Sequence, residues 1–234
     1  SHLCKLKLTF SVGFCVLQRR VNFWGMMQIK YLTIKSPSSD SFIERRSEFI
    51  GYISPATTED EAIAFINSIR EKHRKATHNV YAYLLREGNA TRYSDDGEPQ
   101  GTAGVPVLDI LQKEGLIDVC CVVTRYFGGI MLGGGGLVRA YSHAAKIAVD
   151  SAKKMYMCYC ALLQIDVDYS LYGKVEYALS DFVVKVVDST FGSAVKIEIL
   201  VDLEQEESFT EHIINITNGQ ASIVKLEEKY ADIL

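Results

Sequence analysis

The sequence has little of what marks a fibrous, disordered or membrane-spanning chain. Its 234 residues include four prolines, and 48% of them are hydrophobic against 23% charged. This balance excludes a disordered, collagen-like or coiled-coil protein. No window approaches the roughly 18 uninterrupted apolar residues of a membrane helix. The chain holds enough apolar material for a hydrophobic core, and its length suits one or two domains of about 100–200 residues each.

Cysteine patterns typical of metal or redox sites are also absent. None of the six cysteines forms a CxxC pair, and no histidine lies at metal-ligand spacing from any of them. Cys120 and Cys121 lie inside an apolar run, where cysteine is usually a small buried hydrophobic residue. We therefore predict reduced structural thiols, a cytoplasmic protein, and no metal or cofactor.

Basic residues are scarce in the last third of the chain. Residues 156–234 hold five basic and fourteen acidic side chains, a net charge of −9, whereas residues 1–35 carry +6 and residues 36–155 carry −1. Nucleic-acid binding depends on neutralising phosphates with Lys and Arg. The acidic third is therefore excluded as a nucleic-acid surface, and any nucleic acid must bind the middle of the chain.

Hydrophobic periodicity predicts mixed helices and strands up to residue 152. The expected strands cover residues 28–35, 42–53, 79–86 and 119–123, with a loop over 36–40 and a hairpin turn over 87–89. Thr58 and Glu61 have the spacing of a capping box, which predicts a helix from there to about His73. Further helices are expected over 106–113 and 137–152.

The last third predicts a different pattern. Strands are expected over 162–169, 182–190, 194–202 and 221–230, with helices over 171–179 and 204–217. The order βαββαβ is that of a ferredoxin-like fold. Together with the change in charge, it predicts a second domain. We expect an extension outside the fold over residues 1–26, one domain over 27–154 and a second over 155–234.

Glycines are concentrated between the buried strand and the helix that follows it. Backbone amides and the helix dipole favour an anion at such a helix start. No Walker or dinucleotide-binding signature is present. The alternative is that the glycines only permit a tight turn and close helix packing. The candidate anion-binding residues are Arg125, Gly128, Gly129, Gly133, Gly134, Gly135, Gly136 and Arg139.

An acidic loop forms a second candidate. Asp95, Asp96 and Glu98 lie in the polar segment 94–104, where they can hold a hard cation or act as acid and base. The alternative is a solvated acidic turn. No poised histidine accompanies them, and no serine lies in a GxSxG elbow, so the sequence identifies no catalytic residue.

Basic residues crowd the end of the helix that follows Thr58. They fit either a solvated helix end or contact with an acidic partner such as RNA or a protein surface. Few aromatic residues are expected near them to stack bases. His143 and His212 are isolated and are interpreted as ordinary helix residues. The candidate contact residues are Arg45, Arg46, Arg70, Lys72, Arg74, Lys75 and His78.

Four sequence blocks in the same order resemble those of the YigZ/IMPACT family. They are residues 93–104 (YSDDGEPQGTAG), residues 122–130 (VVTRYFGGI) with the continuation to Tyr141, residues 76–83 with Ala-Thr-His-Asn, and residues 42–51. The resemblance covers roughly residues 27–152. The C-terminal third resembles the second domain of bacterial members in its pattern and placement.

This resemblance implies an α+β protein whose first domain has the left-handed βαβ fold of ribosomal-protein, GHMP-kinase and elongation-factor domains. It implies a ferredoxin-like second domain similar to the last domain of elongation factor G. Eukaryotic IMPACT regulates translation through protein contacts, and bacterial members have been linked with nucleic acid or the ribosome. Gly134 stands where many members have Thr, and Val80 where many have Cys, which counts against an enzyme.

These features predict a non-enzymatic regulatory or binding protein linked to translation. Its expected partners are the ribosome, RNA or a translation-regulatory protein, and no membrane. The alternative is an enzyme acting on a small phosphorylated or nucleotide-like ligand, with Asp95 or Asp96 as base and Arg125 or Arg139 binding the phosphate. The sequence does not determine the oligomeric state.

Overall fold

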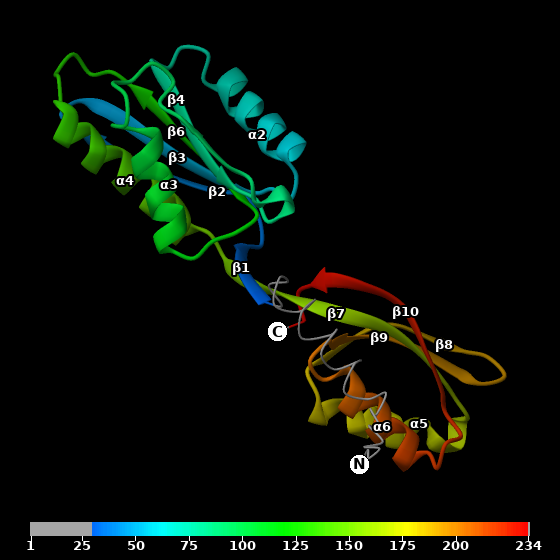
Figure 1. Cartoon of the computed structure of the whole chain (residues 1–234). Helices are drawn as coiled ribbons and strands as arrows, with labels where there is room; N and C mark the ends of the chain where they lie inside the picture. The colour runs from blue at the N-terminus through cyan, green and yellow to red at the C-terminus, as the bar shows by residue number, and fades with distance from the viewer. Residues whose placement is uncertain (1–29, 234) are drawn as a thin grey trace, which may run out of the picture. The chain divides into compact units, whose positions relative to one another are not determined.

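The computed structural model describes residues 30–233 (Figure 1). The predicted extension, residues 1–26, lies outside this range. The described chain forms two compact units, an N-terminal unit of Tyr31–Met157 and a C-terminal unit of Cys158–Ile233 with Lys30. The division predicted at residues 154 and 155 falls at the start of a long strand, β7 (Lys154–Val167).

The N-terminal unit is built on a five-stranded antiparallel sheet in the order β2-β3-β6-β4-β5. Figure 1 shows α2 (Glu59–Lys72) on one face of this sheet, and α3 (Gly104–Lys113) with α4 (Gly134–Ser151) on the other. A short 3-10 turn, Glu87–Asn89, joins β4 to β5. The elements are β1 (Lys30–Ile34), β2 (Ser38–Glu44), β3 (Ser47–Pro55), α2 (Glu59–Lys72), β4 (His78–Leu84), β5 (Thr91–Ser94), α3 (Gly104–Lys113), β6 (Val119–Tyr126) and α4 (Gly134–Ser151).

The sheet separates two hydrophobic cores, one under each layer of helices. Under α2, Ala62, Ile66 and Ile69 pack on Cys120 and Val122. On the opposite face α3 and α4 cover the alternate side chains of β3, β4 and β6. The central strand β6 is therefore buried on both faces from Val119 to Arg125. This explains the continuous apolar run that predicted it, because such a strand has no polar face.

The start of α2 follows the predicted capping box with one difference. The Thr58 hydroxyl accepts from the Glu61 amide at 3.2 Å, as the spacing requires. The Glu61 carboxylate reaches back to the Thr57 amide at 2.7 Å, which is one residue earlier than the standard partner. The Thr57 amide and hydroxyl both donate to this carboxylate, and these hydrogen bonds lower the pKa of Glu61, since they favour its charged form.

The prediction of a loop over 36–40 and an unbroken strand over 42–53 is wrong. β2 begins inside the expected loop, and the chain reverses at Arg45 and Arg46 before β3 returns alongside it. Both arginines have left-handed backbones, with φ of 45° and 67°. Such a two-residue turn favours Asn-Gly, and each side chain there costs about 1–2 kcal/mol. An Arg-Arg pair therefore does not signal the turn.

The C-terminal unit confirms the predicted ferredoxin-like order. Its sheet runs β10-β7-β9-β8 and is antiparallel, with β1 also paired to β7. Helices α5 (Tyr169–Ala178) and α6 (Glu206–Ile216) cover one face of this sheet (Figure 1). β7 begins earlier than the predicted start at Leu162. The other elements are α5 (Tyr169–Ala178), a 3-10 turn (Leu179–Asp181), β8 (Val184–Phe191), β9 (Val195–Asp202), α6 (Glu206–Ile216) and β10 (Ser222–Ala231).

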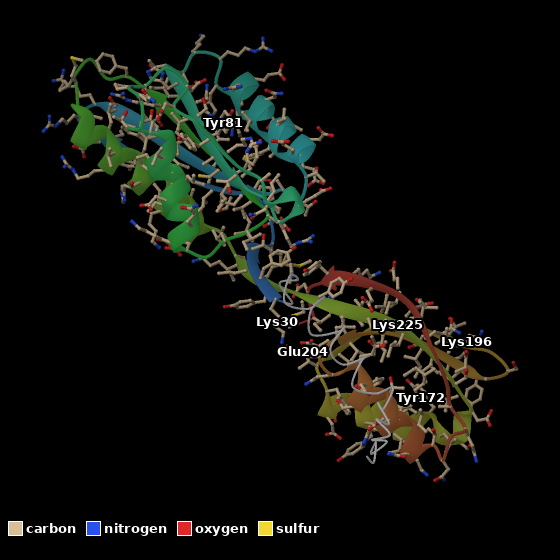
Figure 2. The ribbon with its side chains drawn as sticks, viewed as in Figure 1. Lys30, Tyr81, Tyr172, Lys196, Glu204 and Lys225 are labelled. Atoms are coloured by element: carbon tan, nitrogen blue, oxygen red, sulfur yellow. The ribbon has the colours of Figure 1, made fainter. Side chains whose placement is uncertain are left out.

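Two lysines of this unit form ion pairs with carboxylates. Asp202 is buried, and its carboxylate lies 2.8 Å from Nζ of Lys30, which is labelled in Figure 2. Lys225, labelled in the same figure, lies 2.8 Å from the Glu206 carboxylate. In the described part of the chain, no helix has both the length and the apolar character needed to cross a membrane.

The described cysteines are buried free thiols, as predicted: Cys120, Cys121, Cys158 and Cys160. Burial raises the pKa of Cys121 and of Cys160 to about 12. A thiol held in its neutral form is a poor nucleophile. These side chains therefore act as small core residues.

Candidate functional site

Segments that lie far apart in the sequence meet where β6 ends. The register of β6 places Arg125 opposite both Phe49 on β3 and His78 on β4. The Thr77 amide donates to the Arg125 carbonyl at 2.9 Å. We call this region the loop end, defined as the hairpin turn 45–46, the segment 74–78 and the segment 127–136. It brings together residues that the sequence analysis assigned to two separate candidates, the glycine-rich segment and the basic cluster.

Three glycines of the loop end are required by the backbone. A Cβ on Gly128 would lie 2.0 Å from the Arg46 carbonyl oxygen, so no side chain fits there. Gly129 and Gly133 have left-handed backbones, with φ of 84° and 72°. This part of the segment fits the alternative interpretation, in which glycine permits a turn and a close approach.

The next glycines are not explained in this way. α4 starts at Gly134, earlier than the predicted start at 137, and within the described residues no side chain caps it at Gly133. A Cβ on Gly134 would have its nearest neighbour at 3.9 Å, and one on Gly135 would lie 3.7 Å from a guanidinium nitrogen of Arg139. Neither position requires glycine. Gly134 and Gly135 are exposed, so no side chain of their own shields the backbone at the start of α4, as anion binding there requires.

Arg125 does not flank this helix start as a free cation. Its side chain is buried, and Nη1 donates to the Glu98 carboxylate at 2.6 Å. The guanidinium lies between the rings of Phe49 and Phe127, at 5.4 and 5.5 Å from their centroids. Of the two arginines predicted to bind an anion, Arg139 is the exposed one.

The carboxylates of the acidic loop also have hydrogen-bond partners within the protein. Asp95 accepts hydrogen bonds from the amides of Gly101, Ala103 and Gly104, at 2.9, 3.1 and 2.8 Å. It therefore caps the start of α3. Asp96 accepts from Arg70 at 3.0 Å and from the Asn79 amide at 2.6 Å. The interpretation of this loop as a solvated acidic turn is wrong.

Glu98 is the buried member of the loop. Besides Arg125, its carboxylate accepts from the Tyr141 hydroxyl at 2.7 Å, and Nε2 of His78 lies 3.7 Å away. Burial raises the pKa of Tyr141, and the neighbouring charge of Glu98 raises it further. Among the described residues no group of three or more His, Cys, Asp or Glu side chains is placed to hold a metal ion. The enzymatic hypothesis assigned the base to Asp95 or Asp96, and both of these carboxylates already have partners.

The predicted basic cluster is divided between internal and exposed positions. Arg70 pairs with Asp96, and its guanidinium lies over the ring of Tyr81 at 5.6 Å. Nζ of Lys72 lies 4.8 Å from the ring centroid of Tyr52. The expectation of few aromatic residues near these cations is therefore wrong. However, Arg70 and Lys72 already lie over these rings, so the rings are not free to stack on nucleic-acid bases.

The exposed side chains at the loop end are apolar at Phe127, Ile130 and Met131. The other exposed side chains at or beside it include five cations. They belong to the hairpin turn, the segment after α2, and the first turns of α4. Arg74 is exposed and lies 2.5 Å from the Glu71 carboxylate, an ion pair that solvent screens. The exposed cations are Arg45, Arg46, Arg74, Lys75 and Arg139.

A hollow beside α4 was missed by the sequence analysis. It has a volume of about 260 Å³ and lies between β2 and α4. His143, taken for an ordinary helix residue, lines it four residues after Arg139, and its ring contacts Phe42 at 4.5 Å between centroids. The i, i+4 spacing of Arg139 and His143 was the available signal. The lining residues are Phe42, Glu44, Arg45, Leu132, Gly136, Arg139, Ala140 and His143.

Comparisons with known proteins place this geometry in a family. A model of the Impact N-terminal domain matches residues 45–149, and one of a domain of unknown function, DUF1949, matches residues 165–220. The chain is 37% identical to IMPACT family member YvyE of Bacillus subtilis over 205 residues. This match covers 86% of this chain and 94% of the relative. This chain belongs to the IMPACT family.

Other IMPACT-family relatives match along most of the chain. IMPACT family member YigZ of Escherichia coli is 28% identical over 187 residues, covering 79% of this chain and 92% of the relative. A crystal structure described as that of a hypothetical protein is 26% identical, with a TM-score of 0.57. It covers 87% of this chain and all of that one. These matches include both units, as the sequence blocks and the C-terminal pattern predicted.

Proposed function

We propose that this IMPACT-family chain is a non-catalytic binding protein of the translation machinery, and that the loop end of its N-terminal unit makes the contact. The link to translation rests on the family resemblance. The observation that carries the proposal is the division of charge at the loop end. The acidic signature residues are used inside the fold, while the cations around them face solvent.

An acidic partner suits this surface for two reasons. Arg45 and Arg139 line one hollow together with Gly136 at the start of α4, so positive groups from two segments face one region. Exposed arginines bind phosphate and carboxylate oxygens in pairs, which favours them at such contacts. Ribosomal RNA supplies phosphates at high density. We therefore propose the RNA of the ribosome as the binding partner of this surface.

Co-sedimentation with ribosomes tests the proposal. The wild-type chain should travel with ribosomes at low salt and be released at high salt, because phosphate contacts weaken as salt rises. Arg74→Glu combined with Lys75→Glu places acids in the segment after α2, and should leave most of the protein at the top of the gradient at low salt. It should also flatten the salt dependence of any remaining binding.

A matched control separates the surface from the total charge. Lys113→Glu with Lys174→Glu changes the net charge by the same amount at exposed positions that are not part of the loop end. This control should bind as the wild type does. Wild-type protein that stays at the top of the gradient at both salt concentrations refutes the proposal, as does equal loss of binding in the test and control variants.

A further inference from the structure

The hollow beside α4 collects basic side chains from two parts of the chain. Arg45 enters from the hairpin turn, while Arg139 and His143 enter from successive turns of α4. Glu44 is the acidic residue in the lining, and its carboxylate lies 4.0 Å from Nε of Arg45 with both side chains exposed. The lining therefore carries net positive charge. Phe42, Leu132 and Ala140 supply its apolar part.

The turn that brings Arg45 to the hollow is conformationally unfavourable. Both Arg45 and Arg46 have left-handed backbones, where asparagine and glycine are preferred. Asn-Gly at these two positions would stabilise the turn more than Arg-Arg does. Strained residues of this kind persist where the side chain has a use. Here the use we identify is to place a guanidinium at the mouth of the hollow.

α4 leaves room for an occupant beside these cations. Gly135 has no side chain. The Arg139 guanidinium folds back along the helix and lies 3.7 Å from the position that a Cβ on Gly135 would occupy. Gly136 lines the hollow itself. The phenyl ring of Phe42 stacks on Phe49 at 5.3 Å and meets the His143 ring edge-on, which holds the imidazole in place.

We propose that this hollow is a binding site for a phosphomonoester, held by Arg45, Arg139 and His143. This inference deepens the proposed function and rests on it for the role of the site. A phosphomonoester carries a charge close to −2 near pH 7, which matches two guanidiniums and an imidazole N–H. Guanidiniums bind its unesterified oxygens in pairs.

The size of the hollow limits what enters it. Its volume of about 260 Å³ is below the roughly 300–1,000 Å³ of pockets that enclose drug-sized ligands. A terminal phosphate with its sugar suits this space, and the rest of the ligand extends into solvent. Two sources share this chemistry, a free mononucleotide and the 5′-phosphorylated end of an RNA chain.

Calorimetric titration of the full chain tests the proposal. The probes are adenosine 5′-monophosphate against adenosine, and an RNA hexanucleotide with a 5′-phosphate against the same RNA with a 5′-hydroxyl. We expect the phosphorylated member of at least one pair to bind at least tenfold more tightly than its partner. Preference for the mononucleotide identifies the free nucleotide as the source, and preference for the phosphorylated RNA identifies the RNA end.

Two variants separate binding from folding. Arg139→Ala should weaken binding of the preferred probe at least tenfold. Arg45→Asn with Arg46→Gly should weaken it as strongly while raising the urea midpoint, because it relieves the turn. A loss of binding caused by damage to the fold would lower that midpoint instead. Lys113→Ala serves as the control and should bind as the wild type does.

The inference is overturned if the phosphorylated and unphosphorylated probes of both pairs titrate alike. It is also overturned if the two variants bind as tightly as the wild type. A chain that co-sediments with ribosomes but does not distinguish the probes removes the phosphomonoester site and leaves the proposed function standing. Discrimination between the probes without co-sedimentation removes the proposed function alone.

Discussion

Replacing Glu98 with glutamine leaves the buried guanidinium of Arg125 without a carboxylate beside it. In the wild type the two groups are 2.6 Å apart, and Glu98 also accepts from the Tyr141 hydroxyl at 2.7 Å. Nε of Arg125 has no hydrogen-bond partner among the described residues. The neutral amide of Glu98→Gln keeps one acceptor oxygen but removes the charge that offsets desolvation of the arginine.

The expected loss of folding stability is large for a substitution that only replaces a carboxylate oxygen with an amide nitrogen. Removing one partner of a buried ion pair destabilises a protein by about 3–5 kcal/mol, since the other charge stays buried and uncompensated. Glutamine keeps the volume and one hydrogen bond, so the lower end, about 3 kcal/mol, is expected. For a unit of this size that corresponds to a fall in melting temperature of roughly 10 °C.

Urea denaturation followed by far-UV circular dichroism measures this loss, and hydrogen exchange on peptides from β6 and α4 assigns it to the N-terminal unit. The double variant Glu98→Gln with Arg125→Met removes the buried charge together with its partner. It should recover most of the stability, because an apolar side chain of similar length needs no counter-charge. A loss below about 1 kcal/mol in the single variant, or a double variant no more stable than the single one, refutes this reasoning.

Three further changes test the rest of the site. Gly128→Ala should lower the urea midpoint sharply, because its methyl group would lie 2.0 Å from the Arg46 carbonyl oxygen; a midpoint equal to the wild type's would contradict the close approach. Asp95→Ala should cost about 1–3 kcal/mol and speed amide exchange at the start of α3, since it removes the acceptor of three amides; unchanged exchange there would exclude the cap. Burial lowers the pKa of His73, with the charge of Lys72 as a smaller cause, so the unfolded chain binds the proton more tightly. Stability should therefore be full above about pH 6.5, the ordinary His value, and fall as the pH drops below it. His73→Gln should reduce that dependence in urea titrations at pH 5 and pH 7, and an identical dependence in the variant would assign it to other groups.

Local sequence patterns predicted the structure correctly where a few neighbouring residues determine the local backbone conformation. The Thr58 capping box predicted the start of α2, because a hydroxyl and a carboxylate three residues apart satisfy amides that no other group reaches. The apolar run at Val119 predicted a strand buried on both faces, and β6 confirms it. The order of elements after residue 160 likewise predicted the ferredoxin-like unit, since each short element carried its own periodicity.

Local signals failed where the sequence carried a weak or misleading pattern. Arg45 and Arg46 form a tight turn in a conformation that favours asparagine and glycine, so the residues give no indication of it. β7 begins at Lys154, well before its apolar part, because pairing with other strands extends it. In both places long-range pairing outweighed local preference, as it often does in strands.

The sequence by itself determined most of the elements, the family and which residues carry charge. Only the tertiary structure decided which charges remain available. Glu98 and Arg125 are 27 residues apart in sequence and form a buried pair because α4 and the end of β6 exclude water from both. Arg45, Arg139 and His143 share a hollow because the hairpin folds back against α4. A buried charge is stabilised by a nearby counter-charge, whereas an exposed charge can bind a partner. Which charges are buried depends on contacts between distant segments, and no local sequence pattern encodes these contacts.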